Sequence, residues 1–79
     1  MKLYSVKDKK RGFMNPILIQ NDEMAVRGFQ AAAKNQESEI SMYADDMELW
    51  QVGTWNENTG EIKSDIKFLV NAKRSIENE

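Results

Sequence analysis

The chain has 79 residues, a formal net charge of −2 at pH 7, and neither cysteine nor histidine. A chain of this length forms one domain and buries only about 60% of its unfolded surface, so further contacts are needed for stability. Without cysteine and histidine there are no disulfides, no thiolate ligands and no imidazole base, which excludes zinc centres and nucleophilic triads. We therefore expect no catalytic residues, no metal site and no cofactor.

The first elements are two short strands joined by a charged turn. Residues 3–6 are predicted to form a strand, and the apolar run over residues 13–19 is predicted to return as its partner. Pro16 lies in the returning arm and cannot donate a backbone hydrogen bond. This arm is therefore expected to lie at a sheet edge or to be split.

A helix is predicted from Asp22 to about Lys34. Asn21 can cap its first free amides, and the acids at residues 22–23 complement the positive end of the helix dipole. One face carries the apolar stripe Ala25, Phe29, Ala32 and Ala33. Gly28 costs up to about 1 kcal/mol relative to alanine inside a helix. Either a sheet backbone approaches it closely or the helix simply tolerates it.

The strongest local pattern lies in residues 46–62, which predict a strand, a tight turn and a returning strand. Residues 56–60 supply the turn chemistry, with Gly60 in the left-handed position that closes a type I turn with a bulge. Apolar residues occupy both registers of the first strand, so both faces need cover. Alternatively, a bulge near Gly53 shifts Val52 onto the face of Leu49.

The segments on either side of this hairpin are less regular. Residues 40–43 are predicted to make one helical turn. Residues 66–72 alternate as a strand does but also place apolar residues on one helix face, and we expect a short helix or an irregular segment there. The charged tail over residues 73–79 is expected to fray.

These elements predict a single α+β domain, in which a small antiparallel sheet built from two hairpins carries one main helix on one face. Because one helix covers only one face, Trp50 and Val52 are expected to form the interface of a homo-oligomer, in the simplest case a dimer. The chain has neither the apolar core of a signal peptide nor the roughly 20 apolar residues of a membrane span. We expect a soluble intracellular protein without a membrane partner.

One cluster suits contact with nucleic acid, because cations bind phosphates and aromatic rings stack on bases. The candidate residues are Tyr4, Lys7, Lys9, Lys10, Arg11 and Phe13. Charged hairpin tips also serve solubility alone, and Asp8 interrupts this cluster. The acidic balance of the chain argues against coating of nucleic acid by bulk electrostatics. A second group of acids, over residues 45–48, fits no calcium-loop spacing and is interpreted as solvated.

The order of these pieces resembles the small nonstructural protein of gokushoviruses, single-stranded DNA phages of the Microviridae. The resemblance is carried by the strand in residues 1–10, the Pro16 segment, the capped helix with Arg27 and Phe29, and the hairpin of residues 46–60. Trp55 and Asn56 stand where the family usually has Phe-Asp.

The resemblance implies a non-enzymatic phage protein of the host cytoplasm. Its expected role is to assist the switch from duplex replication to single-stranded genome synthesis and packaging, by binding single-stranded DNA or a phage replication protein. The alternative is a protein-interaction module that modulates a host protein without contacting DNA. The family has no established catalytic residues, so none is carried over to this chain.

Overall fold

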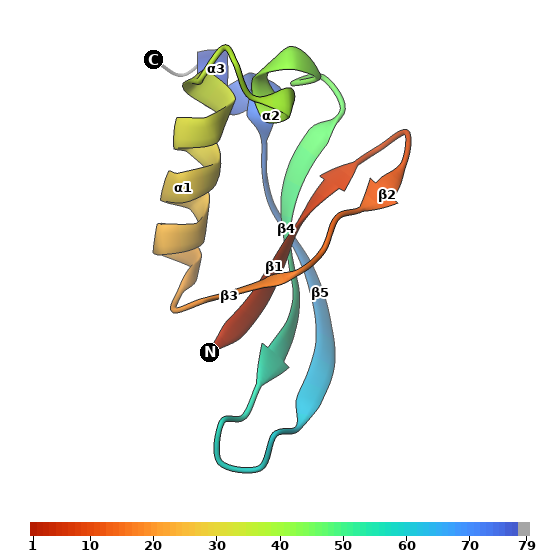
Figure 1. Ribbon diagram of the computed structural model, residues 1–79, viewed down its shortest axis with the longest axis vertical. Coiled ribbons are helices and arrows are strands. Elements are labelled where there is room, and N and C mark those ends of the chain that lie inside the picture. The colour runs from red at the N-terminus through yellow and green to blue at the C-terminus, as the bar shows by residue number, and fades with distance from the viewer. Residues whose placement is uncertain (78–79) are drawn as a thin grey trace.

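The computed structural model describes residues 1–77. Its strands are β1 (Lys2–Asp8), β2 (Gly12–Phe13), β3 (Ile17–Ile19), β4 (Met47–Trp55) and β5 (Ile62–Asn71), and its helices are α1 (Asp22–Lys34), α2 (Glu39–Met42) and α3 (Ala72–Glu77). The strands form one antiparallel sheet in the order β2-β1-β4-β5, with β3 also paired to β1 (Figure 1). The predicted α+β fold is confirmed.

The arm that contains Pro16 lies at the sheet edge and is also split. Strand β4 pairs along the whole of β1, so β2 and β3 share the other edge of β1. The three residues between β2 and β3 include Pro16, which cannot donate to the ladder. Met14 keeps this interruption close to β1, since its amide donates to the Val6 carbonyl at 2.8 Å and its carbonyl accepts from the Ser5 hydroxyl at 2.6 Å.

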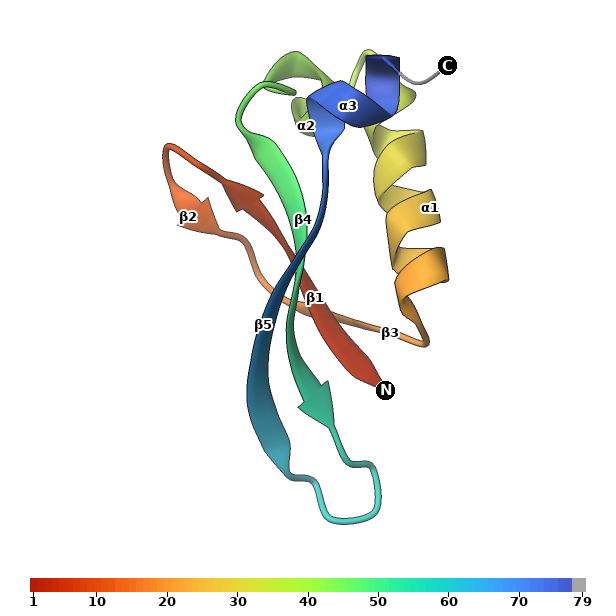
Figure 2. The same ribbon diagram turned by 180° about the vertical axis from the view of Figure 1, so that it is seen from behind.

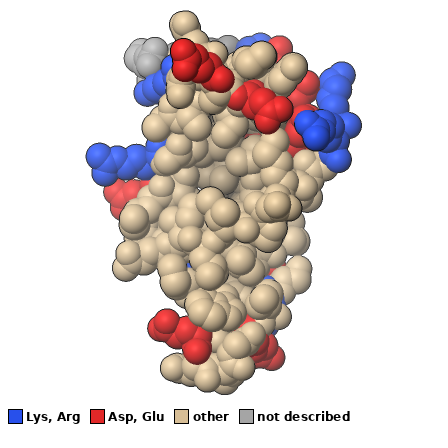
Figure 3. Space-filling model, viewed as in Figure 1, with Lys and Arg blue, Asp and Glu red and all other residues tan. Residues whose placement is uncertain are grey.

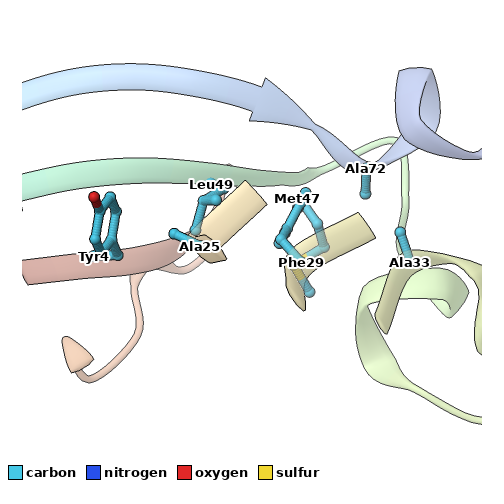
Figure 4. Packing of buried hydrophobic residues seen from close by; sticks show 7 residues of the cluster. All are labelled: Tyr4, Ala25, Phe29, Ala33, Met47, Leu49 and Ala72. Atoms are coloured by element: carbon cyan, nitrogen blue, oxygen red, sulfur yellow. The ribbon is translucent and has the colours of Figure 1, made fainter. Parts of the chain in front are cut away.

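Helix α1 has the predicted bounds and packs its apolar stripe on the sheet. The Asn21 side chain accepts from the Met24 amide at 2.9 Å and caps the helix. The buried apolar residues lie between α1, the sheet and α3 (Figure 4); they are Tyr4, Ala25, Phe29, Ala33, Met47, Leu49 and Ala72. Gly28 is exposed, and a Cβ added there meets no atom within 4 Å outside its own helix. The alternative of a close sheet backbone at Gly28 is therefore wrong.

Strand β4 contains the bulge that the sequence placed near Gly53. Tyr4 pairs with Gln51 and Leu3 pairs with Gly53, which leaves Val52 without a partner on β1. Val52 is half-buried and does not pack against the core cluster. A Cβ on Gly53 would lie 2.6 Å from the Lys63 carbonyl oxygen, so the close approach of β5 requires glycine here.

The turn between β4 and β5 follows the prediction. Gly60 has a φ of 77°, and its amide donates to the Asn56 carbonyl at 2.7 Å. This hairpin projects beyond the rest of the sheet and lengthens the molecule, whose extents are 40 × 24 × 19 Å (Figure 1).

The C-terminal segment differs from the sequence prediction. Strand β5 continues to Asn71, so the predicted helix or irregular segment over residues 66–72 is wrong. Pairing with β4 satisfies the backbone of these residues, which a local helix pattern does not take into account. Residues 72–77 form α3, which is capped by the Asn71 side chain, since this side chain accepts from the Arg74 amide at 2.7 Å, and which buries Ala72 and Ser75. The fraying expected for the tail stays a prediction. Residues 78–79 lie outside the described part.

The helices leave one face of the sheet open. Both views show α1 along one side of the sheet and α2 and α3 near one end of it (Figures 1 and 2). Within residues 1–77, no helix covers the opposite face. Side chains on that face must gain their contacts from one another or from a partner.

Candidate nucleic-acid interface

The basic turn consists of Lys9, Lys10 and Arg11, between β1 and β2. Asp8 holds it in shape: its carboxylate accepts from the Lys10 amide and its carbonyl accepts from the Arg11 amide, both at 2.9 Å. Gly12 follows with a φ of 112°, which favours glycine. Asp8 is buried, whereas the three cations of the basic turn are exposed. The acid that interrupts the cationic cluster in the sequence therefore builds the turn that presents it.

Acidic residues lie close to the basic turn. Lys10 and Arg11 share a hollow with the carboxylates of Asp8, Glu39 and Asp46. The space-filling view shows blue and red side chains next to each other at the upper right, where the β1–β2 hairpin lies (Figure 3). These carboxylates weaken the positive potential on one side of the turn, so the turn by itself is a modest site for phosphate.

Lys7 lies apart from the basic turn, on the open face of the sheet. It is opposite Phe13 on β2 and opposite Glu48 on β4, and residues directly opposite in an antiparallel pair share a face. Its ammonium nitrogen lies 5.3 Å from the ring centroids of both Phe13 and Trp50. This distance is typical of a cation held over aromatic faces.

Three rings continue this arrangement across the sheet, and we call Phe13, Trp50 and Phe68 the aromatic strip. Trp50 lies between the other two, with centroid distances of 5.9 Å to Phe13 and 5.6 Å to Phe68. Both contacts are edge-to-face, with interplanar angles of 83° and 75°. The Trp50 indole N–H donates to a Glu48 carboxylate oxygen at 3.0 Å, which fixes the orientation of the central ring.

Tyr4 is wrong as a nucleic-acid contact, because it is fully buried on the helix side of the sheet. Its hydroxyl donates to Asp22 Oδ1 at 2.5 Å, and Lys2 Nζ lies 3.3 Å from the same oxygen. Burial, and then the hydrogen bond to Asp22, raise the pKa of the Tyr4 hydroxyl. The same hydrogen bond, assisted by Lys2, lowers the pKa of the Asp22 carboxyl although burial opposes it. Tyr4 therefore attaches α1 to β1.

The other predicted residues fall into two groups. Lys9, Lys10 and Arg11 form the basic turn, whereas Lys7 and Phe13 lie on the open face with Trp50. Sequence reasoning missed Phe68, because its segment was interpreted as a helix or irregular. The available signal was the period-two spacing of Ile66, Phe68 and Val70.

Two further features bear on chemistry. Among residues 1–77, no three carboxylates are grouped closely enough to hold a metal ion. No helix in this part of the chain has the length and apolar character needed to cross a membrane.

The fold and this surface define a small α+β domain with cations and aromatic rings on a sheet face that no described helix covers. The family model described as Phage ORF5 protein matches residues 1–75, and the chain belongs to this family of bacteriophage proteins. Comparisons with curated proteins and with solved structures gave no match. The phage origin predicted from the resemblance is confirmed, and the narrower assignment to gokushoviruses stays a prediction.

Proposed function

We propose that this phage protein is a non-enzymatic accessory in the replication or packaging of a gokushovirus genome. It acts in the host cytoplasm by binding single-stranded DNA or the phage replication complex. The observation that supports this proposal is that one hairpin carries the basic turn at its tip and Lys7 and Phe13 on the open face of its strands. Cations at the rim can bind the phosphates of a DNA strand, and aromatic rings on the face can stack on its bases.

The charge available at this surface limits the affinity. Each phosphate neutralised on a single strand contributes a slope of about −0.7 to the dependence of log affinity on log salt concentration. Four cations, Lys7 and those of the basic turn, give at most roughly −3. The neighbouring carboxylates lower this value further. We therefore expect weak, salt-sensitive binding for one subunit, strengthened when an oligomer presents two basic turns to one strand.

The test is titration of labelled single-stranded and duplex DNA at several salt concentrations. The triple variant Lys9→Glu, Lys10→Glu and Arg11→Glu should abolish binding and leave the Tm nearly unchanged, because exposed charges contribute little to stability. The matched control makes the same change in net charge elsewhere, at Lys63, Lys73 and Arg74, which are exposed on β5 and α3. If both variants lose the same affinity for DNA, the loss is caused by the change in net charge and not by the position of the basic turn. No salt-sensitive binding at tens of micromolar would refute the DNA proposal.

A second function, as a protein-interaction module for a host protein, is favoured by β5. This strand ends the sheet order, and residues 62–68 are all exposed. The unpaired backbone groups of an edge strand can pair with a strand of another chain. Capture of a partner from infected host cells by both the wild type and the basic-turn variant would support this function. If the basic-turn variant captures no partner, the capture by the wild type is better explained by nucleic acid that binds both proteins.

Self-association is the remaining proposal, with Trp50 and Val52 as the predicted interface. A small domain with one uncovered sheet face gains burial in a dimer. Sedimentation at micromolar concentration should show a dimer or larger species. A monomer alone would contradict it and would agree with the bulge that separates Val52 from the regular ladder.

A further inference from the structure

We propose that the aromatic strip is a base-stacking site for single-stranded DNA, with Lys7 placed to contact a phosphate of the stacked nucleotides. This inference rests on the proposed function, because it states how a bound strand is held. It also assigns Trp50 to the nucleic-acid surface in place of the self-association interface.

The register places the strip on one face and extends it across the sheet. Phe13 is opposite Lys7, Lys7 is opposite Glu48, and Trp50 is opposite Phe68. Glu48 and Trp50 are two residues apart on β4 and share a face, whereas Met47 and Leu49 point to the core. The strip therefore spans from β2 to β5 on the face of the sheet opposite the core.

The two outer rings are accessible. Phe13 is 48% exposed and Phe68 is 45% exposed, and Trp50 between them is half-buried. Because neighbouring rings are nearly perpendicular, they do not form one plane on which a continuous stack of bases could lie. We infer that bases stack singly on the outer rings, with Trp50 as the rigid spacer between them. The strip then binds one or two unpaired bases and discriminates against a duplex, whose bases are already stacked.

The charges around the strip favour a polyanion over an apolar protein surface. The Lys7 ammonium lies over two of the three rings, and the cations of the basic turn come shortly before Phe13 in the chain. A protein partner with an apolar surface would have to desolvate Lys7, whereas a phosphate pairs with it. Glu48 is the opposing charge, and its carboxylate is engaged by the Trp50 indole N–H.

Glu48 provides a test that cannot be confused with misfolding. Glu48→Gln keeps an oxygen that accepts from the Trp50 indole and removes a negative charge next to Lys7. We expect this variant to bind oligothymidylate more tightly than the wild type, with a difference that shrinks as salt is raised. Glu57→Gln, on the exposed turn between β4 and β5, is the matched control and should leave the affinity unchanged. Unchanged or weaker binding by Glu48→Gln would count against the strip.

Removal of ring faces gives the complementary test. Phe13→Leu and Phe68→Leu keep an apolar side chain on the strand and remove the aromatic face. Stacking contributes about 1–3 kcal/mol per base, so each variant should lose about 5- to 150-fold in affinity for oligothymidylate. Ile66→Ala removes an exposed apolar side chain from the same strand as Phe68 and should bind as the wild type does. An unchanged affinity in both leucine variants would overturn the proposal.

Trp50 reports on the strip directly. In a Trp55→Phe background, Trp50 is the single tryptophan, since the chain has two. Bases bound on the strip should quench its emission in parallel with binding measured by the anisotropy of the labelled oligonucleotide. If the oligonucleotide binds without quenching Trp50, and only the basic-turn variant loses this binding, base stacking is refuted and the proposed function stands. Absence of any binding would refute both, and a shift of Trp50 emission with protein concentration alone would assign the strip to self-association.

Discussion

The hydrogen bond between Tyr4 and Asp22 links the central strand to the first residue of α1, and Tyr4→Phe tests what it contributes. The substitution removes only the hydroxyl and leaves the buried ring in place. A hydrogen bond to a charged acceptor contributes roughly 1.5–3 kcal/mol. The Asp22 side chain is 38% exposed, so water replaces part of the lost bond. We therefore expect a loss of about 1–2 kcal/mol in the free energy of unfolding.

The assay is denaturant unfolding of the wild type and Tyr4→Phe at several pH values. The pKa of Asp22 is lowered in the folded state, so its contribution is present above the ordinary value of 3.8 and is lost as pH falls through the folded value. The pKa of Tyr4 is raised, so its contribution is present below the ordinary value of 10.0 and is lost at higher pH. The difference between the two proteins should therefore be largest between these limits and shrink in acid and in alkali.

Tyr43→Phe is the matched control, because Tyr43 is 51% exposed. It should change the free energy of unfolding by less than about 0.5 kcal/mol. A Tyr4→Phe variant as stable as the wild type at neutral pH would refute the reasoning. So would a destabilisation that keeps the same size as pH falls progressively below 3.8, since it would then arise from packing and not from the ionised carboxylate.

Three further substitutions test the packing of the sheet and helix. Phe29→Ala should lose about 3–5 kcal/mol, because the ring is 5% exposed within the core; a circular dichroism melt like that of the wild type would contradict this. Gly53→Ala should destabilise the fold by about 1–3 kcal/mol, because its Cβ would meet the Lys63 carbonyl oxygen at 2.6 Å. Gly28→Ala should stabilise it by up to about 1 kcal/mol, since the helix is open there. A Tm that does not fall in Gly53→Ala would refute the first explanation, and a Tm that falls in Gly28→Ala would refute the second.

Local sequence patterns determined the elements whose causes are local. Helix α1 begins and ends where the Asn21 cap and the apolar stripe predicted, because capping and amphipathic spacing act within a few residues. The turn at Gly60 is equally local, since it depends on one left-handed residue. Pro16 predicted the interruption between β2 and β3 from its missing amide hydrogen.

The C-terminal segment shows where local patterns fail. Residues 66–72 suit a strand or a helix by composition, and the choice depends on whether an unpaired edge of β4 is available to them. That edge is a property of the assembled sheet. Phe68 thereby joins Trp50, and a ring that sequence reasoning did not consider becomes part of the candidate site.

The sequence by itself determined the class of the fold, the main helix, the two hairpins and the concentration of positive charge at the first turn. Only the tertiary structure decided which of the candidate residues share a face. It turned Tyr4 inward to Asp22 and separated Lys7 from the basic turn, placing it among Phe13, Trp50 and Phe68. The physical reason is that strand register and the side on which a helix packs are set by burial of the whole chain, and a shift of one residue reverses every side chain.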